Sequence, residues 1–109
     1  MAKKSVLVVG IGRFGTALVD TLWQNGAEVI ALDSEPGVID ALKDRTSAAF
    51  VGDSTDPRVL SAIGAEHAKV AVVTFGEDFE ASVLTVASLR AMGVKEIIAR
   101  AATQRQAEV

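Results

Sequence analysis

Three glycines and an aspartate carry the clearest chemical signal in the sequence. Gly10, Gly12 and Gly15 form the pattern Gly-x-Gly-x-x-Gly directly after a run of β-branched and apolar residues. Asp33 follows about 20 residues later, as in the dinucleotide-binding fingerprint. Such a turn exposes backbone N–H groups at a helix N-terminus, where the helix dipole favours an anion. The pattern therefore predicts a phosphate-binding turn.

Each residue of this turn has an expected role. Gly10 permits the tight turn, Gly12 leaves room for a phosphate where a Cβ would intrude, and Gly15 lets the helix pack closely on the strand. Ile11 and Phe14 belong to the predicted cofactor site as members of the turn, although the side chain of Phe14 is expected in the core. The alternative is a plain turn that binds nothing.

Arg13 stands in the first turn of the expected helix, where a cation opposes the helix dipole at a cost of about 0.3–1 kcal/mol. This placement is explained if an anion binds there, because a guanidinium can hold a phosphate through two hydrogen bonds. We therefore predict that Arg13 is a second phosphate clamp. A solvated arginine lying across the surface is the alternative.

Asp33 is expected at the end of the second strand, where its carboxylate can accept hydrogen bonds from a ribose diol. Ser34 beside it is included in the predicted site. Asp33 and Glu35 would repel a 2′-phosphate and no arginine follows to receive one, so NADP is disfavoured. ATP, ADP, AMP and NAD(H) remain as ligands, and a loop or cap aspartate is the alternative role.

Two further loops are expected beside the same crevice. Asp53 and Ser54 follow the third strand, where they can bond an adenine, but turns use the same residues, so binding and turn roles stay equally open for Asp53. Thr74 and Gly76 end the fourth strand at the point where the strand order reverses, on the opposite wall. Arg100 can reach a terminal phosphate or pair with an acid.

Composition and spacing argue against catalysis and nucleic-acid binding. The 109 residues fit one compact domain, and the net charge of −3 comes from interspersed acids and bases without a basic stripe. The chain has one histidine, His67, and no cysteine or tyrosine. No Ser-His-Asp or metal-ligand spacing occurs, so we predict no catalytic residue and no metal site. The lack of cysteine suits a reducing cytoplasm.

Strand-like and helical segments alternate along the chain, which predicts parallel βαβ units with right-handed crossovers. We expect a Rossmann-type, doubly wound α/β fold of strand order 3-2-1-4-5, in one domain over residues 1–109. The sixth strand of a complete dinucleotide-binding fold is expected to be missing, as in a domain truncated at its C-terminal end. The expected strands are Ser5–Val9, Glu28–Leu32, Ala48–Val51, Val70–Thr74 and Glu96–Ala101, and the expected helices are Gly12–Gly26, Pro36–Lys43, Pro57–Ile63 and Asp78–Met92.

Five stretches carry a resemblance to a known family: Val8–Gly15, Ala31–Asp33, Gly52–Asp56, Val70–Val73 with Glu80–Ser82, and Ile97–Ala101. Together they resemble the N-terminal nucleotide-binding domain of the potassium-conductance regulators, the RCK or TrkA-N type, and within it the KtrA-like regulators of potassium uptake. Gly-Arg-Phe-Gly inside the glycine pattern is more specific than the pattern itself. The likeness covers essentially the whole chain.

The resemblance implies a regulatory subunit that binds ATP, ADP or NAD(H) and gates a membrane-embedded potassium transporter or channel. It also implies a homodimer, assembled into a ring in the full-length protein, on the cytoplasmic face of the cell membrane. Carried over by position, the phosphate contacts fall on Gly10, Gly12, Arg13 and Gly15, the ribose contact on Asp33, the adenine side on Asp53, and a basic ligand contact on Arg100.

Two other functions stay open. The NAD-binding half of a dehydrogenase would explain the glycines and Asp33, but it explains neither Arg13 nor the lack of catalytic residues. A Rossmann-like scaffold that mainly dimerises is the third hypothesis. For that hypothesis, Phe79, Val83 and Val86 of the long helix are expected to build the chain's own core rather than an interface.

Overall fold

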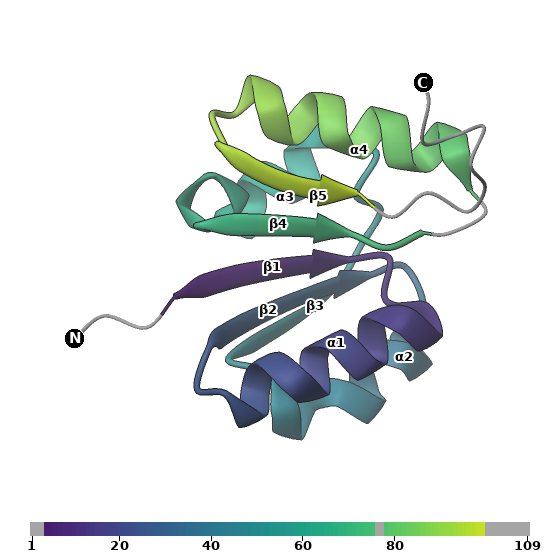
Figure 1. The fold of residues 1–109 in the computed structure, drawn as a ribbon. Coiled ribbons are helices and arrows are strands. Elements are labelled where there is room, and N and C mark those ends of the chain that lie inside the picture. Colours follow the sequence, from purple (N-terminus) through teal and green to yellow (C-terminus); the bar gives the residue numbers. More distant parts are fainter. Residues whose placement is uncertain (1–3, 76–77, 100–109) are drawn as a thin grey trace.

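The structure, a computed structural model, describes residues 4–75 and 78–99. These residues form a parallel sheet whose strands lie in the order β3-β2-β1-β4-β5 (Figure 1). The strands are β1 (Ser5–Val9), β2 (Glu28–Asp33), β3 (Ala48–Val51), β4 (Val70–Val73) and β5 (Glu96–Ala99). The predicted fold class and strand order are confirmed.

The helices cover the two faces of the sheet separately (Figure 1). Helices α1 (Gly12–Gln24) and α2 (Pro36–Leu42) lie on one face, and α3 (Pro57–Ala62) and α4 (Phe79–Ala91) lie on the other. Right-handed crossovers require this division, because the chain moves from β1 toward β3 and then reverses toward β5. Two 3₁₀ helices, Lys43–Arg45 and Ala65–His67, were not predicted.

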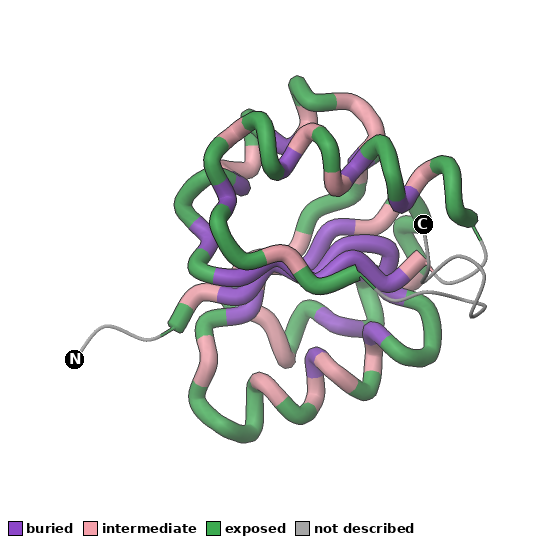
Figure 2. The backbone as a smooth tube through the Cα atoms, turned by 45° about the horizontal axis from the view of Figure 1, so that its top comes forward, coloured by how far each residue is buried: buried purple, intermediate pink, exposed green. Residues whose placement is uncertain are grey.

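The core consists of two apolar layers separated by the sheet. Buried positions gather along the strands (Figure 2). Val6 and Val8 of β1 point toward α1 and α2, whereas Leu7 and Val9 point toward α3 and α4, because successive side chains of a strand alternate between faces. Every residue of β4 is buried. A strand covered on both faces is expected to be apolar throughout, as its sequence predicts.

The start and end signals of the helices are mostly read correctly from the sequence. Asp56 caps α3, since its carboxylate accepts a hydrogen bond from the N–H of Arg58 at 2.9 Å. Asp78, expected as the first residue of the long helix, is instead its N-cap and accepts from the N–H of Ala81 at 3.0 Å. Gly26 follows α1 with φ 81°, which matches its predicted role as a helix stop.

Three apolar side chains expected in the core lie at the surface. Phe14 is 47% exposed because α1 faces the sheet through Gly15 and Val19. Phe79 and Val83 are 37% and 48% exposed, since α4 buries a different row, made of Ser82, Thr85 and Leu89. Val86 does pack against the core, as predicted. The expectation is therefore wrong for Phe14, Phe79 and Val83.

Candidate functional site

The glycine turn connects β1 to α1 at the carboxyl edge of the sheet, and two of its glycines have left-handed backbone conformations. Gly10 has φ 68° and Gly12 has φ 51°. A Cβ built on Gly10 would lie 2.7 Å from a ring carbon of Phe75, whereas a Cβ on Gly12 would meet nothing within 4 Å. The protein itself therefore requires glycine at position 10. The space over Gly12 is open, as an approaching phosphate needs.

Thr74, at the end of β4, holds this turn in place. Its backbone N–H donates to the carbonyl oxygen of Val9 at 2.8 Å, and its buried hydroxyl donates to the carbonyl oxygen of Gly10. A Cβ on Gly15 would come within 2.9 Å of the same hydroxyl oxygen, so the close approach of α1 to β4 also depends on glycine. Thr74 thus positions the turn, and its direct contact with a ligand stays a prediction.

Asp33, the last residue of β2, holds the turn from the other side. Its Oδ2 accepts a hydrogen bond from the N–H of Ile11 at 2.8 Å, and its Oδ1 accepts one from the N–H of Glu35 at 2.9 Å. An ionised carboxylate offers about four acceptor positions, so this arrangement leaves positions for a ribose diol. Ser34 follows at the exposed rim.

The loop after β3 contains two side chains with different surroundings. Asp53 is exposed and its Oδ1 accepts from the hydroxyl of Thr55 at 2.7 Å and from the N–H of Thr55 at 2.9 Å. These bonds stabilise the charged form and lower the pKa of the Asp53 carboxyl. Ser54 is buried, and its hydroxyl lies 2.9 Å from that of Thr85 in α4. The turn role of Asp53 is present, and its binding role stays a prediction.

A cavity of about 430 Å³ opens where these strand ends meet. This volume lies within the range of small-molecule sites. It brings together five of the predicted residues, namely Gly10, Asp33, Ser34, Asp53 and Ser54. It also includes residues outside the predicted cofactor-binding set: Leu32, Gly52, Thr55, Phe75, Asp78, Glu80, Ala81 and Leu84. Phe75 and the α4 residues of this set follow β4 in the chain. The predicted reversal of strand order at β4 is the sequence feature that could have identified them.

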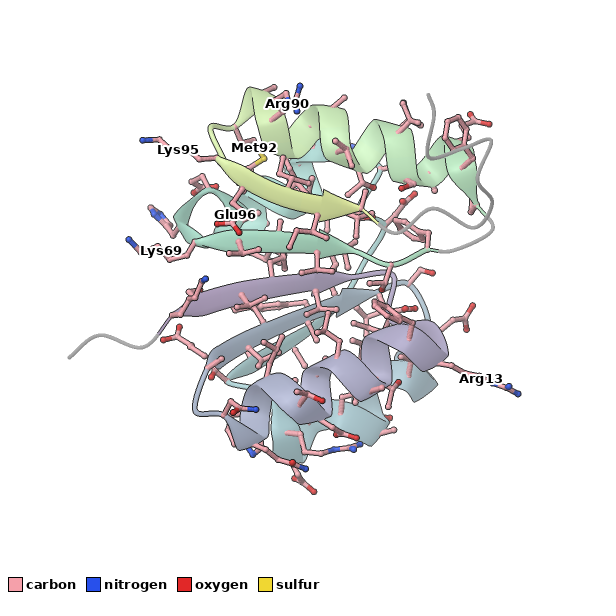
Figure 3. All side chains as sticks on the ribbon, viewed as in Figure 1. Arg13, Lys69, Arg90, Met92, Lys95 and Glu96 are labelled. Carbon is pink, nitrogen blue, oxygen red and sulfur yellow. The ribbon has the colours of Figure 1, made fainter. Side chains whose placement is uncertain are left out.

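Other predicted residues lie outside this cavity. Ile11 is buried, and Gly12 and Arg13 line a second hollow of about 510 Å³ between α1 and α2. Figure 3 shows the side chain of Arg13 pointing outward from the first turn of α1, away from the body of the protein. Gly76 and Arg100 lie outside the described residues. Within the described part, no three His, Cys, Asp or Glu side chains are grouped closely enough to hold a metal ion.

Comparison with known proteins agrees with this architecture. The chain matches the TrkA-N domain over residues 6–109. The chain belongs to the TrkA-N domain family. This TrkA-N domain is 36% identical over 99 residues to the Ktr system potassium uptake protein C of Bacillus subtilis (strain 168), covering 91% of the chain and 45% of the relative. The chain thus spans less than half the length of that relative.

Solved structures show the same fold. The TrkA-N domain of the inner membrane protein YbaL from Escherichia coli superposes with a TM-score of 0.83 at 28% identity, covering 96% of this chain and 78% of that one. The GsuK channel bound to NAD gives a TM-score of 0.82 at 16% identity, covering 98% of this chain and 19% of the channel, a likeness of fold alone. Among the described helices of this TrkA-N domain, none has the length and apolar character needed to cross a bilayer.

Proposed function

We propose that this TrkA-N domain is the regulatory nucleotide-sensing domain of a potassium uptake system. It binds ATP, ADP or NAD(H), and the bound nucleotide gates a membrane-embedded potassium transporter or channel. The observation that carries the proposal is the glycine turn, which lines the cavity with Asp33 through Gly10 and leaves the backbone of Gly12 open. The likeness to a Ktr potassium uptake protein and to a channel bound to NAD supports it.

The polarity of the site supports a definite orientation of the nucleotide. The phosphates lie over Gly12 at the N-terminus of α1, where the helix dipole favours negative charge. The ribose lies at Asp33 and the base enters the cavity, which carboxylates line on several sides. A 2′-phosphate at that position would meet Asp33 at close range, so NADP is disfavoured as the ligand.

Arg13 is the proposed sensor of the terminal phosphate. It is exposed, and its flexible side chain projects beyond the first turn of α1 (Figure 3). ATP and ADP differ by one phosphate, so a contact at Arg13 gives the differential affinity that a conformational switch requires. Arg13→Ala is expected to weaken ATP binding more than ADP binding. Arg90→Ala removes the same charge near the far end of α4 and serves as the control.

The domain acts as a binding subunit and not as an enzyme. Its proposed partners are the transporter or channel subunit and a second copy of itself, on the cytoplasmic face of the membrane, with no role for nucleic acid. The exposed apolar side chains of Phe79 and Val83 on α4 support self-association. Hydride transfer from NADH to any substrate by the purified chain would contradict this assignment and favour a dehydrogenase.

Mass spectrometry of the nucleotide that copurifies with the chain, followed by calorimetric titration with ATP, ADP and NADH, tests the proposal. We expect retention of one of these adenine nucleotides and measurable affinity for it. Equal losses of ATP and ADP affinity in Arg13→Ala would remove Arg13 as the sensor. Failure to retain or bind any adenosine compound would refute nucleotide sensing.

A further inference from the structure

Lysines occupy the positions immediately before three strands of the sheet. Lys4 precedes β1, Lys69 precedes β4 and Lys95 precedes β5, and all three are exposed. Because the strands are parallel, their starts meet at one edge of the sheet, which we call the amino edge. Arg90, in the last turn of α4, is exposed at the same end of the domain (Figure 3). Four cations that are scattered along the sequence are thus gathered opposite the glycine turn.

The pairing of the strands fixes where two of these lysines stand. The N–H of Lys69 donates to the carbonyl oxygen of Ser5 at 2.9 Å, which ties the start of β4 to β1. Val70 pairs with Glu96 in the register of β4 and β5. The residues before them, Lys69 and Lys95, therefore stand next to each other on strands about 4.8 Å apart. Two ammonium groups on neighbouring strands repel each other, and an anionic partner would remove this repulsion.

The described residues leave these cations unneutralised. None of the four forms an ion pair within the described part of the chain. The carboxylates exposed near the same edge belong to Glu28, Glu66 and Glu96. Of these, Glu66 lies 3.4 Å from Nε2 of His67. Figure 3 shows the side chains of Lys69 and Lys95 extending outward past the strand starts, whereas Glu96 lies nearer the sheet. The outermost charges there are therefore positive.

The opposite, carboxyl edge of the sheet is acidic. The carboxylates that line its cavity belong to Asp33, Asp53, Asp78 and Glu80. The domain measures 24 Å along its shortest axis, which exceeds the Debye length of about 8 Å at physiological ionic strength. The two edges therefore act separately on a charged partner, and the net charge of −3 does not describe the amino edge. An anionic plane attracts the amino edge and repels the carboxyl edge, so it orients the domain.

We propose that the amino edge docks on the anionic phospholipid headgroups of a bilayer through Lys4, Lys69, Arg90 and Lys95. Ammonium groups on flexible stems suit a fluid layer of phosphates, because they act as point charges and need no fixed bidentate geometry. Each cation close to an anionic membrane strengthens binding about fivefold. The nucleotide cavity then faces away from the bilayer, toward solvent. The inference rests on the proposed place of the domain at a membrane and needs no bound nucleotide.

Co-sedimentation of the full chain with lipid vesicles tests the amino edge. The vesicles contain either phosphatidylcholine alone or an equal mixture of phosphatidylcholine and phosphatidylglycerol. We expect binding to the anionic vesicles only, and weaker binding as KCl is raised, because salt screens exposed charges. Lys69→Glu should weaken this binding at least about fivefold. Arg58→Glu makes the same charge change at the start of α3, at the carboxyl edge, and should bind as the wild type does. Urea unfolding shows that each variant is folded.

The orientation of the domain gives a second readout. The chain has no cysteine, so one introduced cysteine can carry an environment-sensitive fluorophore. Ala91→Cys at the end of α4 and Glu80→Cys at its start place this probe at opposite edges of the domain. We expect anionic vesicles to change the fluorescence at position 91 and not at position 80.

Three results would overturn the proposal. They are equal vesicle binding by Lys69→Glu and the wild type, a response to vesicles at position 80 rather than 91, and no binding to anionic vesicles at low salt. The last result would leave the amino edge to an acidic protein surface. None of these outcomes alters titration of the free chain with ATP, ADP or NADH, so failure of the membrane contact is distinguishable from failure of nucleotide sensing.

Discussion

Replacing Gly12 by alanine is expected to remove nucleotide binding while leaving the chain folded. The backbone of Gly12 has φ 51°, which costs a non-glycine residue about 1–2 kcal/mol. No atom lies within 4 Å of the added Cβ, so no steric clash adds to this cost. Domains of this kind have about 5–15 kcal/mol of stability, so the variant stays folded.

Two other glycines provide the comparison. Gly26 has φ 81° and open space around an added Cβ, but it follows α1 at the end remote from the cavity. Gly26→Ala therefore carries the same backbone cost without touching the site. Gly10→Ala adds a clash with the Phe75 ring, and overpacking adds about 1–3 kcal/mol to the backbone cost, so this variant should be clearly less stable than the other two.

Urea unfolding and calorimetric titration with ADP measure the two effects separately. Gly12→Ala and Gly26→Ala should lose similar free energies of unfolding. Gly12→Ala alone should lose at least about tenfold in ADP affinity, which corresponds to 1.4 kcal/mol, because its methyl group occupies the phosphate position. Equal ADP affinity in the two variants would refute the placement of the phosphate at Gly12.

Four further variants test the contacts around the site. Asp33→Ala removes the acceptor of the Ile11 N–H and should lower the free energy of unfolding by about 1–3 kcal/mol, with weaker ADP binding by calorimetry. Ser54→Ala and Thr85→Val should each leave a buried hydroxyl group unpaired, and a double-mutant cycle in urea should show that their costs are not additive. The pKa of Asp53 is lowered in the folded state, so its contribution to stability is present at neutral pH and is lost as the pH falls through that lowered pKa, below 3.8. The stability difference between wild type and Asp53→Asn should therefore shrink in acid.

Much of the fold follows from local sequence signals. Alternation of apolar strands with helical segments predicts the strand order, because crossover handedness leaves few alternatives. Asp56 and Gly26 mark helix ends correctly, since a cap and a left-handed residue act within a few positions along the chain. The glycine pattern with Asp33 locates the turn and the adjoining strand end, which the structure places in contact through the Ile11 N–H.

Features that depend on packing between distant segments were not predicted. Periodicity places Phe79 and Val83 on an apolar stripe, but α4 meets the sheet through Ser82, Thr85 and Leu89. The buried row contains two hydroxyl side chains, and the Thr85 hydroxyl is paired with Ser54, 31 positions away. The sequence pattern of α4 alone does not indicate that Thr85 has a hydrogen-bond partner in a distant loop. The contact of Phe75 with Gly10 was not predicted for the same reason, since it joins the ends of β4 and β1.

The contacts of the turn bear on how a nucleotide, bound as proposed, would act on the rest of the domain. The turn is held by Asp33 at the end of β2 and by Thr74 directly after β4, so ligand binding has little backbone to order there. The opposite wall of the cavity belongs to α4, which is joined to the Asp53 loop through the Ser54–Thr85 hydroxyl pair. The outer side of α4 exposes Phe79 and Val83. A nucleotide bound as proposed, in contact with both the loop and α4, would act on the helix that carries these exposed apolar side chains.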